Sequence, residues 1–495
     1  MIANLAMPAR ACLTTLAAIV VTTLGMTAAA SAQGIDTSET RVQTTLDPGL
    51  KRIGTVRPRA VREISGQNWS LGCETLDRGF ASYDSYEDYL VLLGIKRIRL
   101  QGGWATTERE PGKYDWRWLD RVIDDARSRG LEIFLETNYG NPIYPGGGGR
   151  GLSGGFPTSD EALTAWDKWV EAMATRYKGK VRDWEMWNEP NNNKAHTPEM
   201  TADFDIRTAE IIKRVIPDAH VAGGVLNSPH PAYTEGWLKR VTERQKQSLF
   251  TWFIYHGYTL NPDRGHYEDV EKLKVLFQRY APEIKLWQGE AGTQSEYCLD
   301  GALCKYPWTE LTQAKWQARR MLGDLGHDVE SLVFSIADLD YNRWDGYRLG
   351  DMDRYGLVKT DKQYRLLKVK IAYYAVQNVV AIFDDTLVRV PDHPCEVRCA
   401  KATACYAYKN KQSGQQVLVF WDKSGVPSDR NETVPATFTL AKGSFVEPVW
   451  VDTITGGIFE IPAGRLVRDG ETLILKDIPV YDAPSLVTDK ALVIK

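Results

Sequence analysis

The stretch Val181-Arg-Asp-Trp-Glu-Met-Trp-Asn-Glu-Pro-Asn191 joins a short, largely apolar strand to polar residues. Pro190 has no backbone N–H to donate to a sheet, so a strand over 181–187 should end just before it. Glu189 is therefore expected at the end of a strand rather than inside one. Whether this carboxylate takes part in chemistry depends on the fold, which the neighbouring segments indicate.

Between about residues 61 and 380, apolar strands of this kind alternate with amphipathic helices. Eight strands are predicted, at 64–72, 95–100, 131–137, 181–187, 220–226, 251–257, 284–289 and 331–337. Eight strands with intervening helices over some 300 residues predict an α/β fold, a (β/α)₈ barrel. The alternative is an open doubly wound sheet. It usually carries a glycine-rich phosphate turn after its first strand, which this sequence lacks.

A second glutamate follows the seventh predicted strand, in Leu286-Trp-Gln-Gly-Glu-Ala-Gly292. In a (β/α)₈ barrel, chemistry takes place at the C-terminal ends of the strands, so Glu189 and Glu290 should face one mouth. Cleavage of a glycoside needs such a pair, with one neutral acid and one anion. Arg99, at the end of the second strand, is a source of positive charge. His256 and Tyr258, at the end of the sixth, are placed to hydrogen-bond the anion.

The segment from 61 to 380 resembles clan A of the glycoside hydrolases, whose members share a (β/α)₈ barrel. Its stretch Trp184-Glu-Met-Trp-Asn-Glu-Pro-Asn191 is particularly similar to family 39, which a trailing β domain also suits. The resemblance implies that Glu189 is the general acid/base, Glu290 the nucleophile and Asn188 the contact to the substrate 2-hydroxyl. It further implies nucleophile support by Arg99 and Tyr258, and a lining role for His256.

The end of the eighth strand departs from the clan pattern. Many clan members place a Trp there over the bound sugar, whereas this chain reads Phe334-Ser-Ile-Ala-Asp-Leu339. Trp344 or Tyr341, from the following loop, could take that place. Other aromatic residues near predicted strand ends are either sugar platforms or core residues: Trp104, Tyr139, Trp187 and Trp308. Of these, Trp104 and Tyr139 are taken, with Trp344, as candidate substrate contacts.

Two further glutamates, Glu136 and Glu185, lie inside the third and fourth predicted strands. We expect them to be buried partners of Arg97 or Arg99 rather than catalytic groups. The histidines show no metal-ligand spacing, so neither a catalytic metal nor another cofactor is expected.

The composition excludes several other classes of protein. Hydrophobic residues make up 43% and charged residues 25% of the 495 residues, which is typical of a globular chain. A formal net charge of −3 and the lack of a basic run argue against nucleic acid as a partner. No stretch is long and apolar enough for a membrane span. The expected partner is an oligo- or polysaccharide substrate.

Four segments are predicted. Residues 1–32 resemble a signal peptide, with Arg10 before an apolar run and Ala30-Ser31-Ala32 as a cleavage site, so the protein should be secreted, to the periplasm or beyond. Residues 33–60 form an N-terminal segment that could add strands to a β domain. Residues 61–380 form the barrel, and 381–495 a smaller antiparallel β-sandwich with short strands between turn residues.

Cysteine usage agrees with export. Of seven cysteines, Cys12 lies in the predicted signal peptide and six remain, which can pair in 15 ways. Cys298 and Cys304 bracket a short loop and form the most plausible bridge. For the others, Cys73, Cys395, Cys399 and Cys405, disulfides are favoured over a metal site in an oxidising compartment.

The combined prediction is a secreted retaining glycoside hydrolase that cleaves β-type bonds by double displacement. It requires the two carboxyl groups to lie about 5–5.5 Å apart. Two alternatives stay open at this point. One is a transglycosylase that uses the same glutamates, and the other is a non-catalytic glycan-binding protein on a barrel scaffold.

Overall fold

The computed structural model describes residues 34–66, 68–299, 301–343, 352–391 and 395–493. The predicted signal peptide at 1–32 and the predicted sugar contact Trp344 lie outside these residues. The described residues belong to one compact unit.

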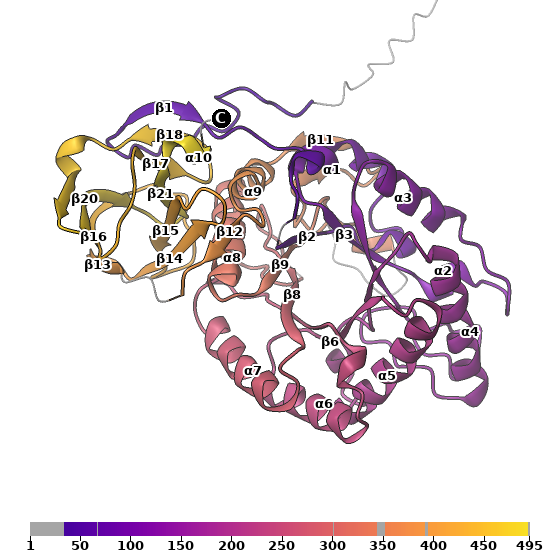
Figure 1. Ribbon diagram of the computed structural model, residues 1–495. Helices are drawn as coiled ribbons and strands as arrows, with labels where there is room; N and C mark the ends of the chain where they lie inside the picture. Colours follow the sequence, from indigo (N-terminus) through magenta and orange to yellow (C-terminus); the bar gives the residue numbers. More distant parts are fainter. Residues whose placement is uncertain (1–33, 67, 300, 344–351, 392–394, 494–495) are drawn as a thin grey trace, which may run out of the picture. The chain divides into compact units, whose positions relative to one another are not determined.

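Eight parallel strands close into a barrel (Figure 1), which confirms the predicted (β/α)₈ fold. In order around the barrel they are β2 (Trp69–Gly72), β3 (Arg97–Gln101), β4 (Glu132–Glu136), β5 (Asp183–Glu185), β6 (His220–Leu226), β7 (Trp252–His256), β8 (Lys285–Ala291) and β9 (Glu330–Val333). The barrel closes where Trp69 of β2 pairs with Ser331 of β9. Each observed strand overlaps one predicted strand.

Helices surround these strands because the strands are buried on both faces and need cover. All five residues of β7 are buried, for example. The helices are α1 (Glu87–Leu93), α2 (Trp104–Thr107), α3 (Arg117–Ser128), α4 (Asp160–Tyr177), α5 (Pro198–Val215), α6 (Pro231–Glu243), α7 (His266–Tyr280), α8 (Glu310–Gly326) and α9 (Ile371–Ile382). Figure 1 shows α3 to α8 following one another around the barrel. Ser159 and Thr197 cap α4 and α5 through their side chains, which fixes where these helices begin.

The C-terminal part is rich in antiparallel β-structure, as predicted. One sheet has the order β1-β18-β17-β21-β15-β14-β12 and another the order β13-β16-β20-β19. Their bounds are β1 (Lys51–Thr55), β12 (Leu387–Arg389), β13 (Cys395–Cys399), β14 (Thr403–Asn410), β15 (Gln416–Asp422), β16 (Val434–Leu440), β17 (Pro448–Asp452), β18 (Gly457–Glu460), β19 (Leu466–Asp469), β20 (Thr472–Val480) and β21 (Ser485–Asp489), with α10 (Lys490–Val493) at the end. Phe420 of β15 packs on Phe438 of β16 with ring centroids 4.5 Å apart, so the two sheets share a core.

Two features connect this β domain to the rest of the chain. Strand β1, from the N-terminal segment, pairs antiparallel with β18. Lys315 of α8 is fully buried and its Nζ donates to Ser428 O, Arg430 O and Asp482 Oδ1 at 2.8, 2.7 and 2.6 Å.

A separate hairpin, β10 (Val358–Thr360) with β11 (Leu366–Val369), precedes α9.

One predicted disulfide is present, between Cys298 and Cys304. Cys73, Cys395, Cys399 and Cys405 are free thiols in this structure, contrary to the expectation of further bridges. Within the described residues, no helix is both long and apolar enough to cross a membrane.

Candidate active site

A cavity of about 230 Å³ opens at the C-terminal end of the barrel strands. Glu189 and Glu290 both line it, as do three of the predicted substrate contacts, Asn188, Tyr139 and Tyr258. The rule that places barrel chemistry at strand ends therefore brings these five side chains together.

Glu189 follows β5 in an unusual backbone conformation. Its φ is +46°, in the left-handed region that non-glycine residues rarely adopt, and its N–H donates to Val225 O at 2.9 Å. Strain of this kind clusters at functional sites. The side chain is held at both oxygens, by His256 Nδ1 at 2.7 Å and by Asn192 Nδ2 at 2.5 Å.

Glu290 lies near the end of β8 and is held as an anion. Tyr258 donates its hydroxyl to Oε1 at 2.8 Å, and Arg99 Nη1 donates to Oε2 at 2.7 Å. Burial opposes ionisation, but the charges of His256 and Arg99 and the bond from Tyr258 together lower the pKa of Glu290. A carboxylate kept ionised in this way is suited to act as a nucleophile.

The two glutamates are close neighbours. One carboxylate oxygen of each lies within 4.8 Å of the other, with a nitrogen of His256 within the same distance of both. Burial opposes protonation of His256, yet the charge of Glu290 and the hydrogen bond to Glu189 raise its pKa.

Arg99 is fully buried at the centre of a charged network beneath the cavity. Its guanidinium donates to the carboxylates of Glu74, Glu136, Glu185 and Glu290 at 2.7–2.8 Å. Burial raises the pKa of Glu136 and of Glu185, and the charge of Arg99 only partly offsets this. These two are buried partners of Arg99, one of the two arginines predicted for them.

Asn188 is fixed between that network and the cavity. Its Oδ1 accepts from Arg99 Nη2 at 2.8 Å, and its Nδ2 donates to Tyr139 Oη at 2.8 Å. The amide is thus oriented by two buried partners beside Glu189. Such an arrangement holds an amide ready for a ligand hydroxyl.

Comparisons with known proteins find partial matches to glycosidases. A family model described as beta-galactosidase, that of glycoside hydrolase family 42, matches residues 89–144. The 6-phospho-beta-glucosidase of Clostridium longisporum is 26% identical over 150 residues, which are 28% of this chain and 29% of that protein. The chain thus matches under a third of the length of its curated relatives.

Solved structures extend the likeness to most of the chain. A family 39 glycoside hydrolase from Bacteroides cellulosilyticus superposes with a TM-score of 0.60 at 16% identity, covering 86% of this chain and 81% of the other. The GH39 enzyme from Xanthomonas axonopodis pv. citri gives 0.52 at 15% identity, covering 88% and 95%. The resemblance to clan A of the glycoside hydrolases is confirmed. At these identities the solved structures establish the shared fold.

One predicted substrate contact is wrong. Trp104 has no exposed surface and does not line the cavity. Its ring packs against Trp166 and Trp169 of α4 and donates Nε1 to Glu108 Oε2 at 2.5 Å. Trp104 opens α2, and the turn of that helix directs the ring into the core. Trp187 and Trp308, which the sequence left open between core and platform, are also buried and absent from the cavity wall.

Several cavity residues were not predicted as substrate contacts. Glu74 and Arg78 follow β2, and the strand-end rule applied to the first strand would have indicated Glu74. Asp353 and Tyr355 come from the segment after β9, where no local pattern marks them. Tyr341, considered as a replacement for the missing Trp, does line the cavity, with its ring 4.9 Å from that of Phe80.

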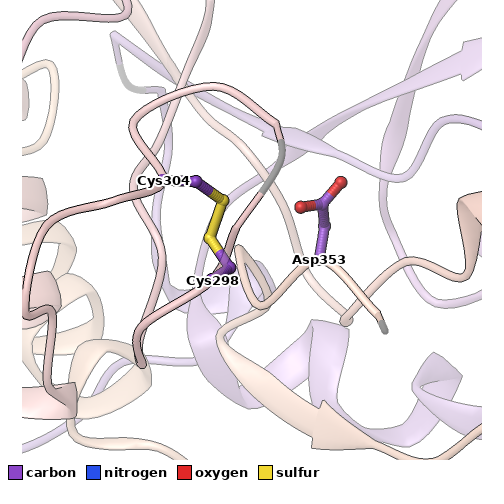
Figure 2. Close-up of side chains that lie close together, drawn as sticks. All are labelled: Cys298, Cys304 and Asp353. Carbon is purple, nitrogen blue, oxygen red and sulfur yellow. A yellow bond between two sulfur atoms is a disulfide. The ribbon is translucent and has the colours of Figure 1, made fainter. Parts of the chain in front are cut away.

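Among the described residues, two groups of side chains bring three potential metal ligands within 4.8 Å of one another. One is Glu189, His256 and Glu290, where His256 Nδ1 is already hydrogen-bonded to Glu189. The other is Cys298, Cys304 and Asp353, drawn in Figure 2. There the two sulfurs are bonded to each other, so they are not available as thiolate ligands.

Proposed function

We propose that this chain is a retaining glycoside hydrolase that cleaves β-type bonds of an oligo- or polysaccharide. The observation that carries the proposal is the pair Glu189 and Glu290, with oxygens within 4.8 Å in one cavity and one carboxylate held as an anion. Retaining enzymes have carboxyl groups about 5–5.5 Å apart and inverting ones about 6.5–9.5 Å. One pair of oxygens within 4.8 Å supports a separation in the retaining range rather than in the inverting range.

In the first step, Glu290 attacks the anomeric carbon while Glu189 gives its proton to the leaving oxygen. The glycosidic C–O bond breaks as the bond to Glu290 forms. In the second step, Glu189 removes a proton from water, which attacks the same carbon and releases Glu290 as a carboxylate.

The surrounding residues support these roles. Arg99 and Tyr258 hydrogen-bond Glu290, so they orient the nucleophile and stabilise it again when it leaves the sugar. His256 holds Glu189 on one oxygen. Asn188, with its amide fixed by Arg99 and Tyr139, is placed for the contact to the 2-hydroxyl that the clan resemblance implies.

We further propose that the protein is exported. The support is the signal-peptide pattern at 1–32 together with the Cys298–Cys304 bridge, since disulfides persist in oxidising compartments. Two residues of the bridged loop, Gly301 and Ala302, line the cavity, so the wall of the site includes a disulfide-closed loop.

The test is hydrolysis of a panel of aryl β-glycosides and of plant and bacterial polysaccharides. Glu290→Ala should abolish hydrolysis. Added azide should restore cleavage of the aryl glycosides by displacing the leaving group directly, which gives a glycosyl azide of inverted configuration. Glu189→Ala should keep activity on substrates with an activated leaving group and give, with azide, a product of retained configuration. Glu132→Ala, an exposed glutamate at the other end of the barrel, is the matched control.

Activity of Glu290→Ala equal to wild type would overturn the mechanism. Transfer to an added acceptor sugar in preference to water would identify a transglycosylase instead. Binding of glycans without turnover of any panel member would favour the non-catalytic alternative.

A further inference from the structure

Glu74 is a third carboxyl group in the wall of the cavity. It lies two residues beyond the end of β2 and is only 3% exposed. Its Oε1 accepts from Arg99 Nη1 at 2.7 Å, and Glu290 Oε2 accepts from that same nitrogen at 2.7 Å. The two carboxyl groups are therefore immediate neighbours around one N–H₂ group.

The second oxygen of Glu74, Oε2, is buried and has no hydrogen-bond partner among the described residues. Buried polar atoms in native proteins are almost always paired, so an unpaired one beside a cavity needs an explanation. The chain makes room for this oxygen, because a Cβ at Gly72 would lie 2.4 Å from it. Glu74 lines the cavity, so a hydroxyl group of a ligand bound there is the available partner for this carboxyl group.

The other members of the Arg99 network differ in this respect. Both oxygens of Glu185 accept from Arg99, and both oxygens of Glu136 accept from Gln101 or Arg99. Neither glutamate lines the cavity. Glu74 alone among the three has contact with the cavity and an unused oxygen.

The chemistry of Glu74 suits a sugar hydroxyl, which both donates and accepts. Burial raises the pKa of Glu74 to about 7, with the charge of Glu290 adding to the effect and Arg99 opposing it. Near neutral pH the carboxyl group is therefore present in both protonation states, so it can donate to a hydroxyl or accept from one.

We propose that Glu74 binds a hydroxyl group of the sugar that reacts with Glu290, and thereby selects for sugars that carry this hydroxyl. The inference rests on the proposed glycosidase function. It adds a specificity-determining contact next to the nucleophile, just beyond β2, which contributes none of the predicted site residues.

The test compares the best 4-nitrophenyl glycoside of the panel with its monodeoxy analogues. For wild type, removing the hydroxyl that Glu74 binds should lower kcat/KM by about 10- to 150-fold, the range for a hydrogen bond to a charged group. Glu74→Ala should lose a similar factor on the parent glycoside and show no further loss on that one analogue. Glu74→Gln can still accept a hydrogen bond from Arg99. Its ratio of kcat/KM for the parent glycoside to kcat/KM for that analogue should be smaller than that of wild type.

Glu136→Gln is the matched control, because it removes one charge from the same network without touching the cavity. It should lower kcat/KM on the parent and on every analogue by one common factor. Discrimination by Glu74→Ala and Glu74→Gln equal to that of wild type would overturn the inference. If the alanine variant does not fold, the Glu74→Gln comparison decides alone. No hydrolysis by wild type would instead overturn the proposed function, and this inference with it.

Discussion

The hydroxyl of Tyr258 provides the most direct test of how Glu290 is kept ionised. Tyr258→Phe removes a single hydrogen bond, 2.8 Å long, to a carboxylate whose side chain is 13% exposed. The ring and its packing on Phe334 are retained. Arg99 and His256 stay in place, so the site loses one donor and no charge.

The size of the effect follows from that geometry. A hydrogen bond to a charged group contributes about 1.5–3 kcal/mol, which corresponds to about 10- to 150-fold in kcat/KM if the whole bond is lost in the transition state. Tyr258 is one of the groups that lower the pKa of Glu290. Without it this pKa rises, so Glu290 becomes protonated at a higher pH and the acid limb of the pH profile moves upward.

The assay is kcat/KM against pH on the best aryl glycoside, for wild type and Tyr258→Phe. Tyr355→Phe is the control, because Tyr355 lines the same cavity but donates its hydroxyl to Ala302 O at 2.6 Å. Its acid limb should stay where that of wild type lies. The reasoning is refuted if the limb of Tyr258→Phe does not move, or if both variants move alike.

Three further outcomes concern the stability of the fold. Trp104→Ala should destabilise the protein by about 3–5 kcal/mol in urea unfolding and leave KM unchanged, since the ring is core; a raised KM at unchanged stability would contradict this. Lys315→Met should cost about 3 kcal/mol because Asp482 and two carbonyls lose their partner; an unfolding midpoint equal to wild type would argue against it. Burial raises the pKa of Asp205 to about 7, so the folded protein binds this proton more tightly than the unfolded chain does. The stability that the protonated carboxyl group contributes is therefore complete below pH 4 and is lost as pH rises through 7. Asp205→Asn should remove this pH dependence of the free energy of unfolding, which amounts to as much as about 4 kcal/mol between pH 4 and 7. Urea unfolding of both proteins across these pH values tests it, and the same pH dependence in the variant as in wild type would refute it.

The barrel and its two glutamates could be predicted because both depend on local patterns. A buried parallel strand has a continuous apolar run, and a proline or glycine marks its end. Once eight such runs are counted, the strand-end rule brings Glu189 and Glu290 to one mouth without any knowledge of distances. The same rule places Arg99 at a strand end, but it lies inside β3 and contacts Glu290 through its guanidinium.

What could not be predicted depends on non-local geometry. The direction of the Trp104 ring is set by the helical turn that begins after Gly103, whose φ is +61°. Asp353 and Tyr355 reach the cavity through a segment fastened from elsewhere in the chain, for example by Gln294 Nε2, which donates to Asp353 Oδ1 at 3.1 Å. No spacing in the sequence encodes such contacts.

The pairing of β1 with β18 has a consequence for the order in which the chain can fold. Strand β1 leaves the ribosome before the barrel, whereas β18 follows it, so this ladder is among the least local in the molecule. Pairings between distant segments form slowly, and until β18 is available β1 has an exposed row of unpaired backbone groups. A truncation that keeps residues 51–55 but ends before 457 would leave that edge open permanently. The β domain therefore completes its sheet only when nearly the whole chain is present.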